Sequence, residues 1–249
     1  MLSLLAFLTT LSFSSFASTS PTLAKTPAFI LAGDSTTAVQ STGGGGWGTG
    51  FLATLIDPSY GVNKGHNGAT TVSFVDGGDW AAVKKLVSGA TASYEVYVTI
   101  QFGHNDQKSE KNISISEFKT NLKALAQDVK DLGATPLILT SLTRRKFDGT
   151  ELKDDLSDVV PAARTAAADS NVALIDLNAA SRKYVQAIGS ENADKYNLVS
   201  GDRTHLNAHG SDVFGRIVAD LILAYNGNLS SWIEKNATLS GLIADGVYA

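Results

Sequence analysis

The sequence contains no cysteine. This absence excludes disulfide bonds, thiolate nucleophiles and zinc sites with cysteine ligands. It does not identify a cellular compartment, because a chain of 249 residues forms a core large enough to need no covalent cross-link. Any nucleophilic chemistry must therefore come from side chains other than thiols.

An excess of charge of either sign is also missing. The chain has 20 lysines and arginines against 24 aspartates and glutamates, a net charge of −4. This balance gives no overall electrostatic basis for binding nucleic acid or an anionic membrane. Because 43% of the residues are hydrophobic and 18% are charged, the composition is that of an ordinary globular protein and not of a disordered one.

The N-terminus lacks both a basic residue and a hydrophobic run long enough to span a bilayer. The apolar stretch LSLLAFLTTLSF (2–13) is followed by small residues that suit signal peptidase. This pattern predicts a secretory signal peptide over residues 1–19, and the missing basic charge leaves a buried first helix open as the alternative. Asn-x-Ser/Thr sequons at Asn112, Asn228 and Asn236 fit a secreted, extracellular glycoprotein.

Four apolar stretches rich in β-branched residues, and a weaker fifth at 60–65, predict the strands of a buried sheet. The four are residues 27–33, 94–103, 135–141 and 171–177. They are continuously apolar instead of alternating, which is typical of strands with both faces buried. We therefore expect a central parallel sheet of about five strands.

Amphipathic stretches lie between the predicted strands. Residues 116–133 carry apolar side chains at helical spacing and end in Gly133, which suits a helix C-cap, and residues 209–227 repeat the pattern. Alternation of strands and helices predicts an α/β fold with helices on both faces of the sheet. Because no linker or internal repeat divides the chain, we expect residues 20–249 to form one domain. We also expect a monomer, because the sequence has no repeated apolar helical faces beyond those that the sandwich needs.

Polar and glycine-rich segments follow the predicted strands, where function collects in such sheets. A serine becomes an effective nucleophile when a histidine takes its proton and a carboxylate orients that histidine. These requirements assign Ser35 as the nucleophile, His205 as the base and Asp202 as its orienting acid. The N–H groups of Ser35 and Gly68 and the side chain of Asn105 are the predicted oxyanion hole.

Each of these residues also has an alternative interpretation. Ser35 is a residue type common in turns and helix N-caps, and Asn105 is one that can close its own turn. His209 is a second candidate base, although it lies where the last long helix is expected to begin. A metal site formed by Asp202, His205 and His209 is a less favoured alternative. Asp34, beside the nucleophile, is expected to brace the turn.

Four blocks in order along the chain resemble those of the SGNH hydrolases, also called GDSL-type esterases. They are Gly33-Asp34-Ser35, Gly68, Gly103-His104-Asn105-Asp106 and Asp202-x-x-His205. The segments AGDSTTA, GWG, FGHND and TRRKFDG resemble the rhamnogalacturonan acetylesterase branch. The resemblance implies a flavodoxin-like three-layer α/β/α sandwich forming a single catalytic domain, with no metal and no organic cofactor. It also implies a secreted serine esterase that removes acetyl groups from the rhamnogalacturonan backbone of pectin.

The second block departs from that branch, because GATTVSF (68–74) stands where an arginine-rich segment is expected. Acetylated xylan, another glycan, or a lipid or thioester therefore remain alternative substrates. A secreted glycan-binding protein without turnover is the alternative from another class. The expected partner in each glycan interpretation is a polysaccharide, with no nucleic acid and no membrane.

Four basic residues and one tryptophan are candidate substrate contacts. Arg144, Arg145 and Lys146 follow a predicted strand at the catalytic edge, and together with Lys108 they are predicted to bind galacturonate carboxylates. The alternative is an ordinary solvated surface. Trp47, in a glycine-rich loop, is either a sugar-stacking platform or a core residue packed beside the site.

Overall fold

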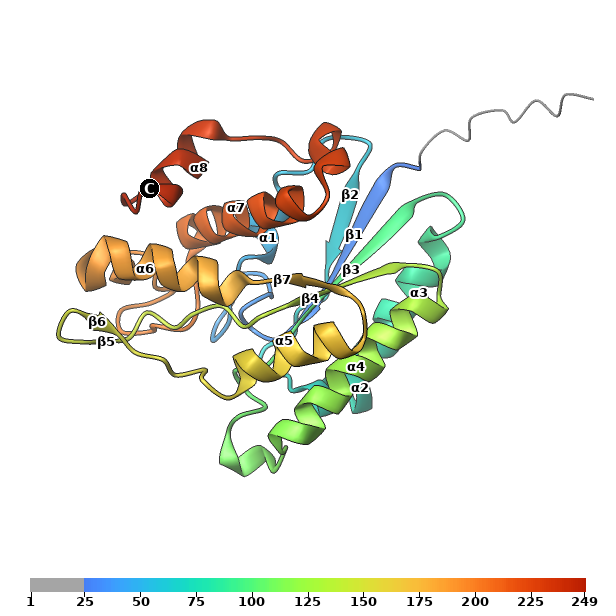
Figure 1. Ribbon diagram of the computed structural model, residues 1–249, viewed down its shortest axis with the longest axis horizontal. Helices are drawn as coiled ribbons and strands as arrows, with labels where there is room; N and C mark the ends of the chain where they lie inside the picture. The colour runs from blue at the N-terminus through green and yellow to red at the C-terminus, as the bar shows by residue number, and fades with distance from the viewer. Residues whose placement is uncertain (1–24) are drawn as a thin grey trace, which may run out of the picture.

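The computed structural model describes residues 25–249. These residues fold around a central five-stranded sheet (Figure 1). The strands are β1 (Pro27–Gly33), β2 (Tyr60–Asn63), β3 (Glu95–Gln101), β4 (Thr135–Leu139) and β7 (Ala173–Ile175). Neighbouring strands pair in parallel, in the order β2-β1-β3-β4-β7. The structure confirms the predicted α/β class and each of the five predicted strands.

The packing of β1 explains why the strand sequences are apolar throughout. Every residue of β1 is buried. Successive side chains of a strand point to opposite faces, so Phe29 and Leu31 enter one hydrophobic cluster while Ile30 and Ala32 enter the other. A central strand covered on both faces therefore requires apolar residues at consecutive positions.

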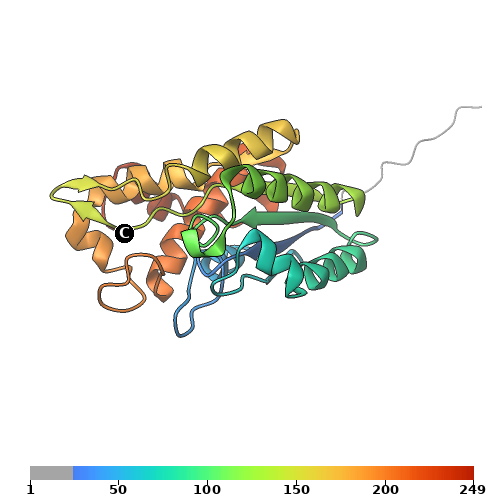
Figure 2. The ribbon, with the colours of Figure 1, turned by 90° about the horizontal axis from the view of Figure 1, so that it is seen from below.

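Helices cover both faces of the sheet. They are α1 (Gly48–Leu52), α2 (Thr71–Asp76), α3 (Asp79–Ala90), α4 (Ile115–Asp131), α5 (Val159–Asp169), α6 (Leu177–Asp194), α7 (Ala208–Tyr225) and α8 (Ala237–Ala244). Helices α1, α6, α7 and α8 pack on one face, and α2, α3, α4 and α5 pack on the other. Figure 2 shows the resulting sandwich of helix, sheet and helix layers.

The two amphipathic stretches form long helices that begin one residue before their predicted starts. The Ser114 side chain caps α4 by accepting a hydrogen bond from the Glu117 N–H, and Gly133 follows the end of α4 with a φ of 74°. The Asn207 side chain caps α7 by accepting from the Gly210 N–H. A small hairpin of β5 (Phe147–Asp148) and β6 (Glu151–Leu152) lies outside the main sheet.

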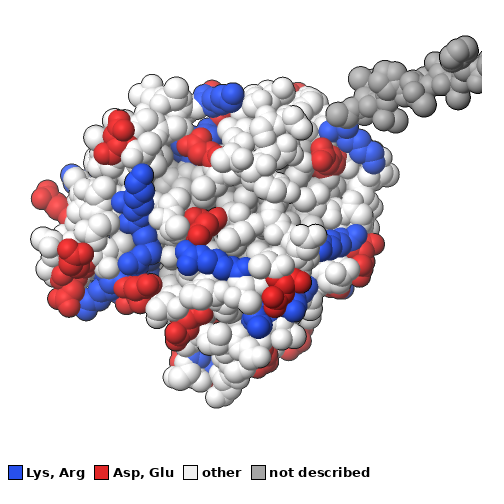
Figure 3. Space-filling view, in the orientation of Figure 1, with Lys and Arg blue, Asp and Glu red and all other residues white. Residues whose placement is uncertain are grey.

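The predicted signal peptide, residues 1–19, lies outside the described residues. Within residues 25–249, no helix combines the length and the apolar character needed to cross a membrane. Lysine and arginine side chains are interspersed with acidic ones on the face shown in Figure 3. This mixture agrees with the nearly balanced charge of the sequence.

Candidate active site

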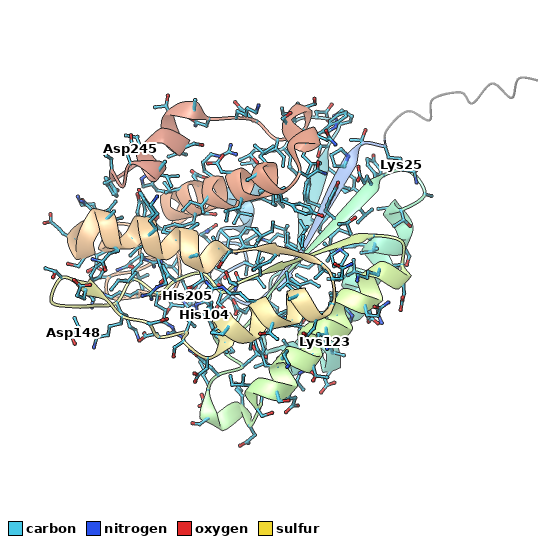
Figure 4. The ribbon with its side chains drawn as sticks, in the orientation of Figure 1. Lys25, His104, Lys123, Asp148, His205 and Asp245 are labelled. Atoms are coloured by element: carbon cyan, nitrogen blue, oxygen red, sulfur yellow. The ribbon has the colours of Figure 1, made fainter. Side chains whose placement is uncertain are left out.

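Ser35, His205 and Asp202 form a continuous hydrogen-bonded chain. Ser35 Oγ lies 2.8 Å from His205 Nε2, and His205 Nδ1 lies 2.8 Å from Asp202 Oδ2. Ser35 is 5% exposed, and the side chains of His205 and Asp202 are 19% and 21% exposed. In Figure 4, His205 lies near His104, which follows β3. The structure thus brings the three predicted catalytic residues together at distances that suit proton transfer.

Backbone hydrogen bonds connect the segment that carries the nucleophile to the segment that carries the base. Ser35 lies in the turn after β1, and His205 lies in the segment that leads to α7. The loop between them contributes Gly45, whose N–H donates to the Ser35 carbonyl at 3.1 Å. The Leu206 N–H in turn donates to the Gly45 carbonyl at 2.8 Å. Two residues 170 positions apart in the sequence are therefore tied through one loop.

Asp202 is held in its ionised form by its own segment. Its Oδ1 accepts hydrogen bonds from the N–H groups of Thr204 at 3.1 Å and His205 at 3.0 Å. Burial by itself raises the pKa of Asp202, but these hydrogen bonds and His205 outweigh it and bring the pKa below its ordinary value. When Nδ1 donates to this carboxylate, Nε2 of His205 is left as an acceptor for the Ser35 hydroxyl.

The predicted oxyanion donors lie at the carboxyl ends of β1, β2 and β3. Within the described residues, the N–H groups of Ser35 and Gly68 donate to no other protein atom. Gly68 is exposed and has a φ of 77°, a left-handed conformation that disfavours any side chain. The Asn105 Nδ2 donates to the Ala69 carbonyl at 2.9 Å. Because an amide nitrogen carries two hydrogens, the second one is left for an oxyanion.

Lys108 determines which way the Asn105 amide points. Its Nζ donates a 2.8 Å hydrogen bond to Asn105 Oδ1. An ammonium group has no acceptor, so its partner must be the amide oxygen, and Nδ2 must face Ala69. Lys108 was expected to bind a substrate carboxylate, but the structure gives it this different partner. Its positive charge polarises the amide and strengthens Nδ2 as a donor.

Two buried carboxylates brace the turns that carry these donors. Asp34 Oδ1 accepts hydrogen bonds from the N–H (2.8 Å) and the hydroxyl (2.7 Å) of Thr36, as expected for a bracing role. Burial pushes the pKa of Asp34 upward, but His104 and Thr36 together hold the pKa below its ordinary value. Asp106 accepts from the N–H and the hydroxyl of Thr71, and burial raises the pKa of Asp106. These contacts tie the first turn of α2 to the segment after β3.

Trp47 is fully buried, so its interpretation as a sugar-stacking platform is wrong. It packs against Phe51, and its Nε1 donates to Gln101 Oε1 at 2.7 Å. The hydroxyl of Thr37 donates to the same oxygen at 3.2 Å. The sequence did not lead us to Gln101, whose side chain accepts hydrogen bonds beside the turn that carries the nucleophile. Its signal was a polar amide at the end of an apolar strand, because a buried amide must find partners.

Arg145 is also fully buried, so the prediction that it binds substrate is wrong. Its Nη2 donates to the His205 carbonyl at 2.6 Å and to the Asp202 carbonyl at 3.2 Å. Burial lowers the pKa of Arg145 to about 10, which still leaves the guanidinium charged at neutral pH. Its role is to support the backbone of the catalytic loop.

The other two residues of the basic segment are more accessible. Lys146 is exposed, and its Nζ lies 3.1 Å from Asp155 Oδ2. Arg144 is partly buried, and its Nη1 donates to the Thr204 hydroxyl at 3.1 Å, next to the catalytic histidine. Arg144 has no acidic partner among residues 25–249. Arg144 therefore lies beside the site with a positive charge that no acidic side chain among the described residues pairs.

His209 does not take the place of His205. Its Nε2 lies 2.9 Å from the Ala249 carbonyl oxygen, and its ring packs against Tyr196 and Tyr248. In the described part of the chain, no three histidine, aspartate or glutamate side chains gather as a possible metal-ligand set. The alternative site that combines both histidines with Asp202 is therefore not formed by these residues.

Residues 31–213 match the GDSL-like lipase/acylhydrolase family model. Two curated relatives from Bacillus subtilis (strain 168) are similar over most of their length. The rhamnogalacturonan acetylesterase RhgT is 30% identical over 207 residues, which cover 77% of this chain and 87% of the relative. The probable rhamnogalacturonan acetylesterase YesY is 29% identical over 198 residues, which cover 76% and 89%.

Solved structures share the fold. Protein YxiM from Bacillus subtilis superposes with a TM-score of 0.70 at 23% identity, covering 82% of this chain and 58% of that one. The acetylxylan esterase Axe2 from Geobacillus stearothermophilus superposes with a TM-score of 0.58 at 18% identity, covering 81% and 94%. The α/β sandwich with a five-stranded parallel sheet is thus the fold of SGNH hydrolases.

Proposed function

This chain belongs to the GDSL-like lipase/acylhydrolase family of carboxylic ester hydrolases, and we propose that it is a secreted esterase that deacetylates the rhamnogalacturonan backbone of pectin. The observation that carries the chemistry is the hydrogen-bonded chain from Ser35 through His205 to Asp202. Similarity to two relatives named for rhamnogalacturonan deacetylation supports the substrate. The leader-like pattern of residues 1–19 supports secretion.

In the first half of the reaction, Ser35 Oγ attacks the acetyl carbonyl carbon while His205 Nε2 accepts the hydroxyl proton. The carbonyl oxygen becomes an oxyanion, which the N–H groups of Ser35 and Gly68 and the Asn105 Nδ2 stabilise. Asp202 stabilises the imidazolium that forms. When the ester C–O bond breaks, His205 protonates the departing sugar oxygen, and the acetyl group remains on Ser35.

In the second half, water attacks the carbonyl carbon of the acetyl-enzyme. His205 accepts a proton from the water, and the same donors stabilise the second oxyanion. The intermediate then expels Ser35 Oγ, which regains its proton from His205, and acetic acid leaves and ionises to acetate in solution. Each half moves one proton through Nε2, so the orientation that Asp202 imposes on the ring serves both.

Of the basic segment after β4, Arg144 is the residue that we propose as a substrate contact. It is partly exposed, and it bonds to Thr204 next to the base. A guanidinium group matches a carboxylate in charge and in geometry. Arg144 therefore contacts a galacturonate carboxylate on the His205 side of the site. Replacing it by glutamine raises KM for the acidic polymer and leaves KM for a small aryl acetate unchanged.

The experiment compares acetate release from acetylated rhamnogalacturonan, acetylated xylan and a small aryl acetate, by the wild type and by Ser35→Ala. We expect the highest kcat/KM on rhamnogalacturonan and no release by the variant. Release from xylan or the aryl ester alone would retain the mechanism and remove the pectic substrate. A folded wild type that releases no acetate from any of the three would instead support a glycan-binding protein without turnover.

A further inference from the structure

A pocket beside the oxyanion hole has no part in the chemistry described so far. It lies between the nucleophile loop and the end of β2, and its volume is about 320 Å³. Val39, Ser41, Lys64, His66, Asn67 and Asp79 contribute to its lining. The size is at the lower end of the range of about 300–1,000 Å³ for small-molecule sites, which suits one sugar residue.

The pocket shares its wall with the catalytic centre. Asn67, which lines it, directly precedes Gly68 of the oxyanion hole. Asn67 Nδ2 donates to Ser41 Oγ at 3.0 Å, and Ser41 begins the loop that is bonded to the Ser35 carbonyl through Gly45. A polysaccharide with one acetyl group at Ser35 can therefore place another residue of the same chain in the pocket.

The unpaired lysine of the pocket points to an anionic sugar. Asp79, the carboxylate of the pocket, already has partners: its Oδ2 lies 2.6 Å from His66 Nδ1, and the residue lies in the first turn of α3. A helix N-terminus stabilises negative charge at that position. Lys64 has no ion pair among residues 25–249. The lining therefore holds one lysine without an acidic partner, beside a carboxylate that is hydrogen-bonded to His66 and beside amide and hydroxyl groups.

We propose that this pocket is a carbohydrate subsite that binds a hexuronate residue of the substrate, with its carboxylate on Lys64. The assignment rests on the proposed function, since a rhamnogalacturonan backbone supplies the uronate. Asn67, Ser41 and His66 bind the sugar hydroxyls. Val39, which is 54% exposed, contributes apolar surface for the C–H face of the ring.

The test measures binding by calorimetry, so that it does not depend on turnover. The ligands are a deacetylated rhamnogalacturonan oligosaccharide and the same oligosaccharide with its carboxyl groups reduced to alcohols. Lys64→Met should weaken binding of the first ligand about tenfold, the loss expected for one charged hydrogen bond. The wild type should bind the reduced ligand no more tightly than Lys64→Met binds the acidic ligand. Lys64→Met and the wild type should bind the reduced ligand equally. Lys183→Met, at an exposed lysine of α6, is the matched control and should bind like the wild type.

Equal binding of the acidic ligand by the wild type and Lys64→Met would overturn the subsite, as would equal binding of both ligands by the wild type. Acetate release from acetylated rhamnogalacturonan separates this failure from that of the proposed function. If the wild type releases acetate but the affinity for the acidic ligand does not depend on Lys64, only the subsite is wrong. If the wild type releases no acetate from this polymer, the pectic substrate itself is wrong.

Discussion

Arg145 donates a 2.6 Å hydrogen bond from Nη2 to the carbonyl oxygen of the catalytic His205. The same nitrogen reaches the Asp202 carbonyl at 3.2 Å, and Nε donates to Asn197 Oδ1 at 2.9 Å. A single buried guanidinium therefore supports both ends of the Asp-x-x-His segment. The position of the base depends on a residue that has no exposed surface to offer a substrate.

Arg145→Met should destabilise the protein and slow the reaction together. The variant leaves the His205 and Asp202 carbonyls and Asn197 Oδ1 without their donor, so we expect the free energy of unfolding to fall by about 2–4 kcal/mol. Denaturant unfolding measures this loss, and kcat on an aryl acetate should fall with it. An unchanged free energy of unfolding combined with a higher KM for polymer would show that Arg145 binds substrate after all.

Trp47→Phe separates packing from sugar binding. The change removes the Nε1–H donated to buried Gln101 and leaves a small void, so the free energy of unfolding should fall by about 1–2 kcal/mol. Because Trp47 is fully buried, KM for the polysaccharide should not change. Unfolding and KM are measured on the same preparation. A large rise in KM with unaltered stability would restore the platform interpretation.

Lys108→Met should lower kcat about tenfold with little change in KM, because its positive charge strengthens an oxyanion donor. Asn105→Ala provides the scale, since loss of the donor itself should lower kcat about 10²–10³-fold. Lys108→Arg retains a charged donor and should recover part of the loss. Lys111→Met, at a nearby exposed lysine, is the control. Equal kcat values for Lys108→Met and the wild type would show that the contact with Asn105 has no catalytic effect.

Asp202→Asn should change how stability depends on pH. The pKa of Asp202 lies below its ordinary value of 3.8, so the folded protein binds this proton more weakly than the unfolded chain does. The ionised carboxylate therefore stabilises the fold above about pH 4, and this contribution is lost as the pH falls through the folded pKa. The wild type should exceed Asp202→Asn in unfolding free energy at neutral pH, and the difference should shrink below pH 3.8. A difference that stays constant down to pH 2 would contradict the assignment.

The strands and the meeting of Ser35, His205 and Asp202 could be predicted because their signals are local. β1 is apolar at every position, and Ser35 follows it at the edge where function collects. Asp202 and His205 are three positions apart, so their pairing needs no knowledge of the rest of the fold. The hairpin of β5 and β6 was not predicted, because strands of two residues have no periodicity.

The roles of the basic and aromatic residues depend on distant contacts, which the sequence does not reveal. Arg145 and its neighbour Arg144 look alike in the chain, yet Arg145 is buried against the His205 loop and Arg144 is partly exposed. Trp47 lies in a loop rich in glycine, and only its packing against Phe51 and Gln101 makes it a core residue. Burial is decided by tertiary packing, which overrides the local character of such residues.

The acetyl-enzyme mechanism is tested most directly by acid quenching of the wild type during turnover of acetylated rhamnogalacturonan, followed by mass spectrometry of its peptides. We expect an added acetyl group on Ser35 in the wild type and none on that peptide in Ser35→Ala. If deacylation is the slower half, the deacetylated polysaccharide, which leaves in the first half, would be released in an initial burst, and acetate would not. An acetyl group on another residue, or turnover by Ser35→Ala at the wild-type rate, would show that Ser35 is not the nucleophile.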